Sequence, residues 1–594
     1  MLAASDLQIS PTCQTVPFLI IAADARLDNR REIEARLGLD AHPRLSDAAL
    51  IGALYDRYGS DCPSHLLGDF AFLIWDEKHQ ILFGARDHFG VRPFYYHTSP
   101  ALFIAATTSE TLLRSGVSPE KDETGMADFV AGAFADQHVT LHRHIQRLPP
   151  GHSIRASHGG TTIQQYWKLV PREPSTERDL GEEFRHIFEQ AIACRMTDPS
   201  VGAMLSGGLD SSSIAMVASR LSEAADQPPL PSLSMTFDAT PGWNEGPFIR
   251  TILQAGHFSP HFLPSDHHDP LRDIDTMLAE QEGPFLAYNH GVSRRIYHFA
   301  SGAGINLLLD GHGGDEVVSH GFGRLNELAM EKRWTRLWHE AGGVAQIFGI
   351  STWQVASPYF DHIRAIRSVR RRWRRVASRA PDTNEATAFN AALVAPDLAR
   401  RTQIAERQAL IACSRSAYQT EQQRHLEILS SPHQAYAFEV FDRASAAAGV
   451  GLRFPFYDRR LVEFCLSAPS TAKLSNGFPR AMLRDAMTQI LPESVRLRRD
   501  KFDFTAQLRS GLSRHCADLL ESLRSRADML TPFLDLGVAR EAITLLAKPE
   551  ERGTEHLFAA WRVAVLIRWL DGQTEPQPTF QDSRMFVHST GERQ

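Results

Sequence analysis

Two short apolar segments of this chain each run directly into a loop of glycine, serine and aspartate. Val201–Leu205 precedes Ser206-Gly207-Gly208-Leu209-Asp210-Ser211-Ser212, and Ile305–Leu309 precedes Asp310-Gly311-His312-Gly313-Gly314-Asp315-Glu316. A helix is expected over 212–222 and a further strand over 233–237. Strands that alternate with helices predict a parallel sheet covered on both faces, and both loops then lie at its carboxyl edge, where such sheets bind ligands.

The region before residue 172 has a different pattern. Apolar segments at 18–22, 69–75, 80–85 and 101–106 are separated by turns, which predicts antiparallel strands. An amphipathic helix is expected over 45–58, capped near Ser46. A mixed α/β chain of two domains is therefore predicted, with an antiparallel domain over 1–172 and a parallel-sheet domain over 178–594, joined by a linker over 171–178.

The second domain contains a long stretch, 322–430, whose composition predicts a helical insertion without strands. Within it lies the basic run Arg367–Arg375. A solvated helical face and a docking surface for an acidic peptide or partner protein are both open for this run. From about Gly572 the chain is polar and rich in Pro and Gln, so a flexible tail is expected over 572–594.

Composition excludes several classes of function. The net charge of -7 and the pI of about 6.4 do not favour nucleic-acid binding. The six cysteines form no CxxC pair, which indicates a reducing cytoplasm rather than a disulfide framework or a zinc site. No signal peptide and no membrane-spanning segment is expected. The pair His267-His268 is interpreted as part of a polar loop rather than as metal ligands.

The first loop has the residues of a phosphate-binding site. Gly207 and Gly208 allow the backbone N–H groups to approach phosphate oxygens at the start of a helix, and Asp210 offers a hard oxygen ligand for Mg²⁺. The loop is not a Walker loop, because no Gly-Lys-Ser/Thr ends it. The pattern therefore indicates a nucleotide site in which ATP is split to AMP and pyrophosphate.

The second loop adds a further carboxylate. Asp315 is predicted to face Asp210 across the nucleotide, so that two carboxylates hold the metal on which pyrophosphate departs. A third group of residues follows Leu452-Arg453-Phe454-Pro455-Phe456-Tyr457-Asp458 and contains Arg480, Arg484, Arg499 and Lys501. Such cations can stabilise charge on pyrophosphate and on a tetrahedral adduct, although Arg484 and Arg499 are also consistent with ordinary surface arginines.

Together with Gly68–Asp76 and Ala85–Tyr96, these motifs make the chain resemble the asparagine synthetase type B superfamily over nearly its whole length. The resemblance implies a glutaminase-like first domain and an ATP-pyrophosphatase second domain. It implies ATP and Mg²⁺, metal ligation by Asp210 and Asp315, a pyrophosphate-binding role for Arg480 in place of the usual Lys, and a catalytic Lys501. The residues implied to contact the nucleotide are Leu205, Ser206, Gly207, Gly208, Asp210, Ser211, Ser212, Met235 and Gly311.

The first domain departs from the family pattern. Leu2 stands where the family has its nucleophilic Cys, whose own α-amine activates the thiol. The family's Asn-Gly-Glu segment is replaced by Ala23-Asp24-Ala25-Arg26. We therefore expect no glutamine hydrolysis and interpret the first domain as a structural module.

The second domain departs as well. Gly451 replaces a Glu that asparagine and β-lactam synthetases use toward the substrate or the attacking amine. His312 stands where the β-lactam branch has a catalytic Tyr, and a histidine can take a proton from an ammonium near its unperturbed pKa of about 6.5. A purely structural His312 is equally consistent with the sequence.

These features are most similar to lasso-peptide macrolactam synthetases. The resemblance implies adenylation of an Asp or Glu side chain of a precursor peptide and attack by the peptide's own N-terminal amine, with a leader-binding protein and a leader peptidase as partners. Two alternatives remain. One is an ammonia-dependent asparagine or β-lactam-type synthetase with a small substrate, and the other is a non-catalytic nucleotide-binding scaffold.

Overall fold

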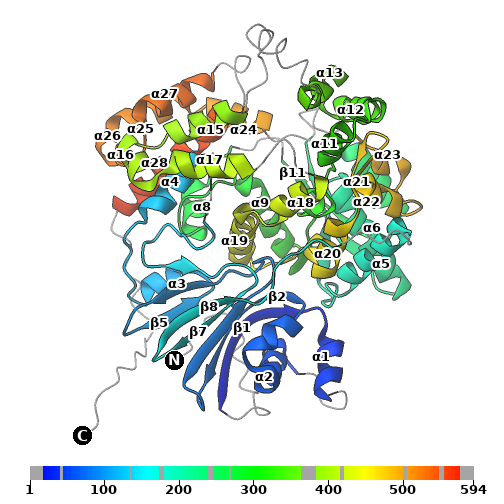
Figure 1. The fold of residues 1–594 in the computed structure, drawn as a ribbon, viewed down its shortest axis with the longest axis horizontal. Helices are drawn as coiled ribbons and strands as arrows, with labels where there is room; N and C mark the ends of the chain where they lie inside the picture. Colours follow the sequence, from blue (N-terminus) through cyan, green and yellow to red (C-terminus); the bar gives the residue numbers. More distant parts are fainter. Residues whose placement is uncertain are drawn as a thin grey trace.

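The structure is a computed structural model, and it describes residues 18–39, 45–133, 136–172, 179–237, 245–265, 269–362, 383–414, 420–499, 505–547 and 554–574. Figure 1 shows the arrangement of these segments. Several predictions concern residues outside them: Leu2, Cys13, the linker residues 173–178, His267-His268, Arg367–Arg375, Lys501 and the tail beyond 574. Within the described part, no helix combines the length and the apolar character needed to cross a membrane.

The first domain is built on an antiparallel sheet, as predicted. Its strands lie in the order β1 (Leu19–Leu27), β2 (Gly68–Asp76), β3 (Ile81–Arg86), β7 (His152–Ser157) and β8 (Gly160–Gln165). A second antiparallel sheet has the order β5 (Phe103–Ala106), β4 (Tyr95–Thr98) and β6 (Gln146–Arg147).

The faces of the first sheet differ because successive side chains of a strand point in opposite directions. Phe72 of β2 packs with Leu54 of α2 (Asp47–Tyr58), whereas its neighbour Leu73 packs with Tyr96 of the second sheet. The hydroxyl of Ser46 accepts a hydrogen bond from the N–H of Ala49 at 3.2 Å and caps α2. The domain is therefore a sandwich of helices, a large sheet and a small sheet.

The second domain contains the parallel sheet that the two loops predict. Its order is β11 (Phe258–Pro264), β10 (Leu230–Thr236), β9 (Val201–Met204), β12 (Leu307–Leu309) and β13 (Gly451–Arg453), and every neighbouring pair is parallel. The helices that share one buried core with this sheet include α5 (Leu180–Ala193), α6 (Leu209–Ala224), α9 (His290–Gly302) and α19 (Pro432–Ala447). Both predicted loops follow central strands, at the same edge of the sheet.

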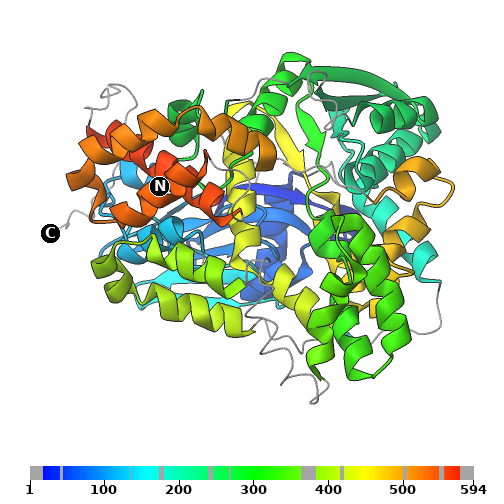
Figure 2. The ribbon, with the colours of Figure 1, turned by 90° about the horizontal axis from the view of Figure 1, so that it is seen from above.

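The stretch 322–430 is helical where it is described, apart from one isolated bridge at Val394, but it does not form one unit. Helices α11 (Gly323–Met330), α12 (Trp334–Phe348) and α13 (Thr352–Ala356) pack together at one corner of the molecule (Figure 1). Helices α15 (Thr383–Ala392), α16 (Pro396–Thr402) and α17 (Ile404–Ser414) lie in a separate helical lobe (Figures 1 and 2). The insertion is thus divided between two places.

The helical lobe packs against the first domain. Its long helix α28 (Glu555–Thr574) packs in one buried core with α4 (Glu123–Ala131) of the first domain. Arg562 of α28 donates to the carbonyl of Val130 at 2.8 Å. Because α28 continues through Thr574, the expected tail from Gly572 begins inside a helix.

Candidate active site

The first loop makes a sharp turn between β9 and α6. Gly207 has a φ of +76°, which favours glycine, and an added Cβ there would lie 3.1 Å from Phe248 Cβ. The hydroxyls of Ser206 and Ser211 lie 2.8 Å apart and close the loop. Gly208 is the N-cap of α6 and provides no side-chain cap, so the first-turn N–H groups of this helix face the loop, as in a phosphate-binding site.

The second loop packs directly against the first, and its glycines make this possible. A Cβ on Gly311 would lie 3.0 Å from the backbone nitrogen of Ser211, and one on Gly314 would lie 2.6 Å from Asp210 Cβ. The distance at Gly314 is too short for any side chain unless Asp210 moves, and the distance at Gly311 is tighter than most real Cβ contacts. The Gly-rich pattern is therefore explained by the close approach of the two loops, which brings Asp210 and Asp315 near each other.

One guanidinium lies between the two aspartates. Arg480 Nη1 is 2.6 Å from Asp210 Oδ2 and 2.8 Å from Asp315 Oδ1, and the residue is only 8% exposed. Burial disfavours its charge, but the carboxylates of Asp210 and Asp315 outweigh burial and raise the pKa of Arg480. The geometry shows that both carboxylates converge on a single cation. Such an oxygen pair suits Mg²⁺, although the metal role itself stays a prediction.

His312 lies in an aromatic cage beside this pair. Its ring is stacked on Tyr457, with centroids 5.9 Å apart, and meets Phe441 edge-on at 4.9 Å. Its backbone N–H donates to Asp310 Oδ1 at 2.7 Å. Nε2 is buried, and no described residue offers it a hydrogen bond. The ring is thus held firmly by packing, while one nitrogen is left for another partner.

The remaining predicted cations are placed differently. Arg484 is buried and donates to the carbonyls of Pro479, at 3.0 Å, and Arg496, so it supports the main chain instead of presenting charge. Arg499 stacks over Phe478 at 4.0 Å and donates to Gln346. Lys501 lies outside the described residues.

Sequence reasoning missed Arg498. Its Nη1 donates to the Gly207 carbonyl at 3.2 Å and to Glu245 at 2.8 Å, and its guanidinium lies 4.2 Å from the Phe248 ring centre. It therefore contacts the first loop directly. Its position beside Arg499 in the sequence is the one signal that marks it.

Two other predicted positions occupy the sheet. Met235 lies near the end of β10, and the adjacent Ser234 hydroxyl donates to the Leu205 carbonyl at 2.7 Å, which ties the strand to the first loop. Gly451 begins β13 opposite Leu307, two residues before the strand ends.

The segment that replaces Asn-Gly-Glu is part of a buried ionic network. Arg26 pairs with Asp69 at 2.8 Å and also with Asp28, and Asp24 lies 3.4 Å from Arg92. Across the domain interface, Arg195 lies 3.3 Å from Asp28. The pairs of Arg26 and Asp24 thus lie within the first domain, and Asp28 connects this network to the second domain through Arg195.

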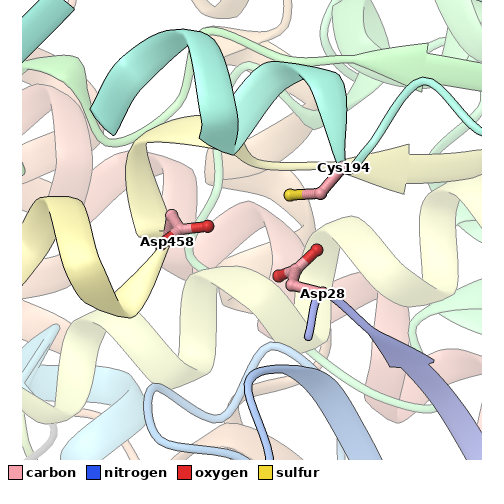
Figure 3. A group of neighbouring side chains, drawn as sticks. All are labelled: Asp28, Cys194 and Asp458. Carbon is pink, nitrogen blue, oxygen red and sulfur yellow. The ribbon is translucent and has the colours of Figure 1, made fainter. Parts of the chain in front are cut away.

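Asp28, Cys194 and Asp458 lie together at this interface (Figure 3), and their ligand atoms are within 4.8 Å of one another. Arg195 lies 2.9 Å from Asp458 and also pairs with Asp28, and Arg460 lies 2.7 Å from Asp458. Burial raises the pKa of the Cys194 thiol to about 12. Arginines pair with both carboxylates and burial keeps the thiol protonated, so these residues form an interdomain ionic cluster in this structure.

A second buried cluster lies on α19. Glu439 is fully buried, with Arg147 at 2.9 Å, Arg86 at 3.3 Å and the Tyr95 hydroxyl donating at 2.6 Å. Burial opposes its charge, but these arginines prevail and lower the pKa of Glu439 to about 2. The same helix carries Phe441 of the His312 cage, so α19 links the first domain to the candidate site.

The fold and site define a two-domain enzyme class, with a glutaminase-type sandwich in front of a nucleotide-binding parallel sheet. Residues 183–571 match the asparagine synthase family, and residues 11–167 match the glutamine amidotransferase domain. The chain belongs to the asparagine synthase family of ATP-dependent amide-forming ligases.

Relatives include "Asparagine synthetase [glutamine-hydrolyzing] 3" of Bacillus subtilis, which is 25% identical over 86% of this chain and 78% of its own. A second B. subtilis relative, "Asparagine synthetase [glutamine-hydrolyzing] 1", is 25% identical over 79% of this chain and 72% of its own. "Amidase chyE" of Penicillium rubens is 26% identical over 46% of this chain and 42% of its own.

Proposed function

We propose that this chain is an ATP-dependent macrolactam synthetase of the lasso-peptide type. It adenylates an Asp or Glu side chain of a precursor peptide and releases pyrophosphate. The N-terminal amine of the same peptide then attacks the acyl-adenylate, which forms an isopeptide bond and releases AMP. Because amine and carboxylate belong to one molecule, the enzyme needs no ammonia.

The nucleotide half of this proposal rests on the two interlocked loops. The N-terminus of α6 and the turn at Gly207 provide N–H groups for phosphate oxygens, and Asp210 and Asp315 provide carboxylate oxygens for Mg²⁺. A metal held there would neutralise charge on the departing pyrophosphate. Arg480 would then exchange its carboxylate contacts for phosphate oxygens, and Lys501 would stabilise charge on the reacting carbonyl.

The observation that carries the proposal is the ionic network in the first domain. Where the family has Asn-Gly-Glu, Arg26 and Asp24 are used in ion pairs with Asp69 and Arg92. This network supports a first domain that produces no ammonia from glutamine. On this proposal the nitrogen arrives with the substrate.

His312 suits the removal of a proton from the incoming ammonium. A neutral imidazole can accept a proton at its free nitrogen, and Nε2 is unpaired among the described residues. The aromatic cage of Phe438, Phe441 and Tyr457 fixes the ring orientation and excludes water, which would otherwise hydrolyse the adenylate.

The decisive experiment incubates the purified chain with ATP, Mg²⁺ and a leader-free precursor peptide. We expect AMP release and a product lighter by one water, and loss of both with Lys501→Ala. Lys168→Ala, a change of an exposed lysine in the first domain, is the matched control and keeps both. Release of AMP only with aspartate and ammonia would refute the proposal. Pyrophosphate release that depends on Lys501 would exclude the scaffold alternative.

A small-substrate synthetase is the second candidate, because two relatives that overlap most of this chain are named asparagine synthetases. It predicts AMP formation from a free amino acid with ammonia. Gly451 weighs against it, since the strand position used for a functional Glu carries no side chain. Comparison of peptide with free aspartate plus ammonia separates the two candidates. Only the peptide-substrate proposal implies partners, which are a leader-binding protein and a leader peptidase in the cytoplasm.

A further inference from the structure

Exposed apolar side chains are concentrated on α11, α12 and α13. Among the described residues, five of the twelve large hydrophobic side chains that are well exposed fall between Met330 and Trp353: Met330, Trp338, Phe348, Ile350 and Trp353. Phe348 and Trp353 are each 58% exposed. Single exposed hydrophobic residues need no explanation, but such a local concentration marks an interaction surface.

The aromatic rings on this corner form two contact groups. Trp353 lies 6.3 Å from Trp338 and 5.7 Å from Phe360, whose ring is stacked on Trp334 at 5.2 Å. Beneath them, Leu337, Ala341 and Val344 bury the opposite side of α12. The unit therefore has its own core, and the exposed rings are not needed to complete it.

The second ring group leads to the candidate active site. His320 Nε2 lies 3.3 Å from Asp315 Oδ1, and the His320 ring is stacked on Phe322 at 5.2 Å. Phe322 in turn lies 6.0 Å from Phe348 at the end of α12. A continuous series of rings thus runs from one carboxylate of the site to an exposed aromatic residue.

A second connection runs through the main chain. A Cβ on Gly343 of α12 would lie 2.8 Å from the Gly477 carbonyl carbon, and Glu340 accepts from the Gly477 N–H at 2.6 Å. Gly477 directly precedes β15 (Phe478–Pro479), which leads into Arg480. The middle of α12 is therefore held against the hairpin that presents Arg480 to the two aspartates.

We propose that this surface, formed by Trp338, Phe348, Ile350 and Trp353 beside the partly buried Phe322, binds apolar and aromatic side chains of the peptide substrate. The proposal rests on the proposed function and names the substrate class: a peptide with aromatic residues besides the reacting carboxylate. Continuity with the site favours this occupant, because a peptide whose carboxylate reaches Asp210 and Asp315 extends outward along the adjacent ring series. A free amino acid would leave these rings uncovered.

The test measures binding separately from catalysis. The probes are two fluorescent peptides with a free N-terminus and a single Glu, one with several aromatic residues and one with Ser in their places. Anisotropy is recorded with the wild type, with Phe348→Ser/Trp353→Ser, and with Phe262→Ser, a matched change on the exposed face of β11. We expect the double variant to lose about tenfold or more in affinity for the aromatic peptide. The control variant and ATP affinity stay unchanged.

Three results would overturn the inference. The first is equal binding of the two peptides by the wild type, which includes no binding of either. The second is unaltered binding of the aromatic peptide by the double variant. The third is sedimentation that shows a dimer for the wild type and a monomer for the double variant. The last would identify a self-association face instead. Failure of the proposed function gives a different result. Binding that depends on the aromatic residues, without AMP release or ring formation, would refute the proposed reaction and support the binding surface. Ring formation by a wild type that binds the two peptides equally removes the surface and keeps the chemistry.

Discussion

Gly314 lies where any side chain would collide with Asp210. A Cβ there would come within 2.6 Å of Asp210 Cβ, so Gly314→Ala must displace the carboxylate. A displacement of about 1 Å can lower a catalytic rate by about a hundredfold, and we expect a loss of this size in AMP release. Gly302→Ala, at a helix end with no atom within 4 Å of the new Cβ, is the control and keeps full activity. A Gly314→Ala enzyme with normal AMP release would contradict this geometry.

Arg480 balances the charge of the two neighbouring carboxylates of Asp210 and Asp315. Arg480→Ala leaves Asp210 and Asp315 facing each other, so the free energy of unfolding should fall by about 1–3 kcal/mol in metal-free buffer. The same change should strengthen Mg²⁺ binding in the absence of nucleotide, as measured by calorimetric titration.

Arg524→Ala, on an exposed arginine of the helical lobe, is the matched control and should change neither quantity. Unchanged Mg²⁺ affinity in Arg480→Ala would show that the two carboxylates do not form a common cation site.

At the scale of elements, α19 carries two functions on neighbouring residues. Glu439 forms ion pairs with arginines of the first domain. Phe438 and Phe441 hold the His312 ring. Glu439→Gln removes a buried charge from between two arginines and should destabilise the protein by about 3–5 kcal/mol at neutral pH. Urea unfolding measures this loss. The control is Glu406→Gln, a change of an exposed residue of α17 that should leave the stability unchanged.

The pH dependence of this effect has a definite sign. The folded pKa of Glu439, about 2, lies below the unfolded value of about 4.3, so its contribution is present above the unfolded value. It is lost as pH falls from about 4.3 through about 2. The stability difference between wild type and Glu439→Gln should therefore shrink over this window. A difference that stays constant down to acid pH would mean that Glu439 is not the group responsible.

At the scale of the whole molecule, the two domains share cores and buried charges. Met126 and Phe129 of α4 lie in the same buried cluster as Trp561 of α28, and Arg195 pairs with Asp28 across the interface. We expect calorimetry to record one cooperative unfolding transition. A chain of residues 179–594 alone should lose that transition, because removal of α4 exposes the helical lobe. Deletion of residues 575–594 is the control, and two separate transitions in the full chain would contradict the shared core.

Periodicity predicts much of this architecture because its signals are local. The strands at 69–75 and 201–205, the Ser46 cap and the glycine loops all follow from near neighbours in the chain. β13 has only three residues and becomes a strand by pairing with β12, more than 140 residues earlier, so no local pattern identifies it. The division of 322–430 between two places is likewise decided by distant partners.

The sequence alone determined the chemistry available at the site: glycines that allow close approach, and two carboxylates that follow central strands. The tertiary structure decided which groups meet. It placed Arg480 between Asp210 and Asp315, caged His312 with rings from α19 and the 454–457 segment, and joined Asp28 to Arg195 across the domain interface. Residue type sets what a side chain can do within a few neighbours, whereas contacts over hundreds of residues depend on how sheets and helices pack.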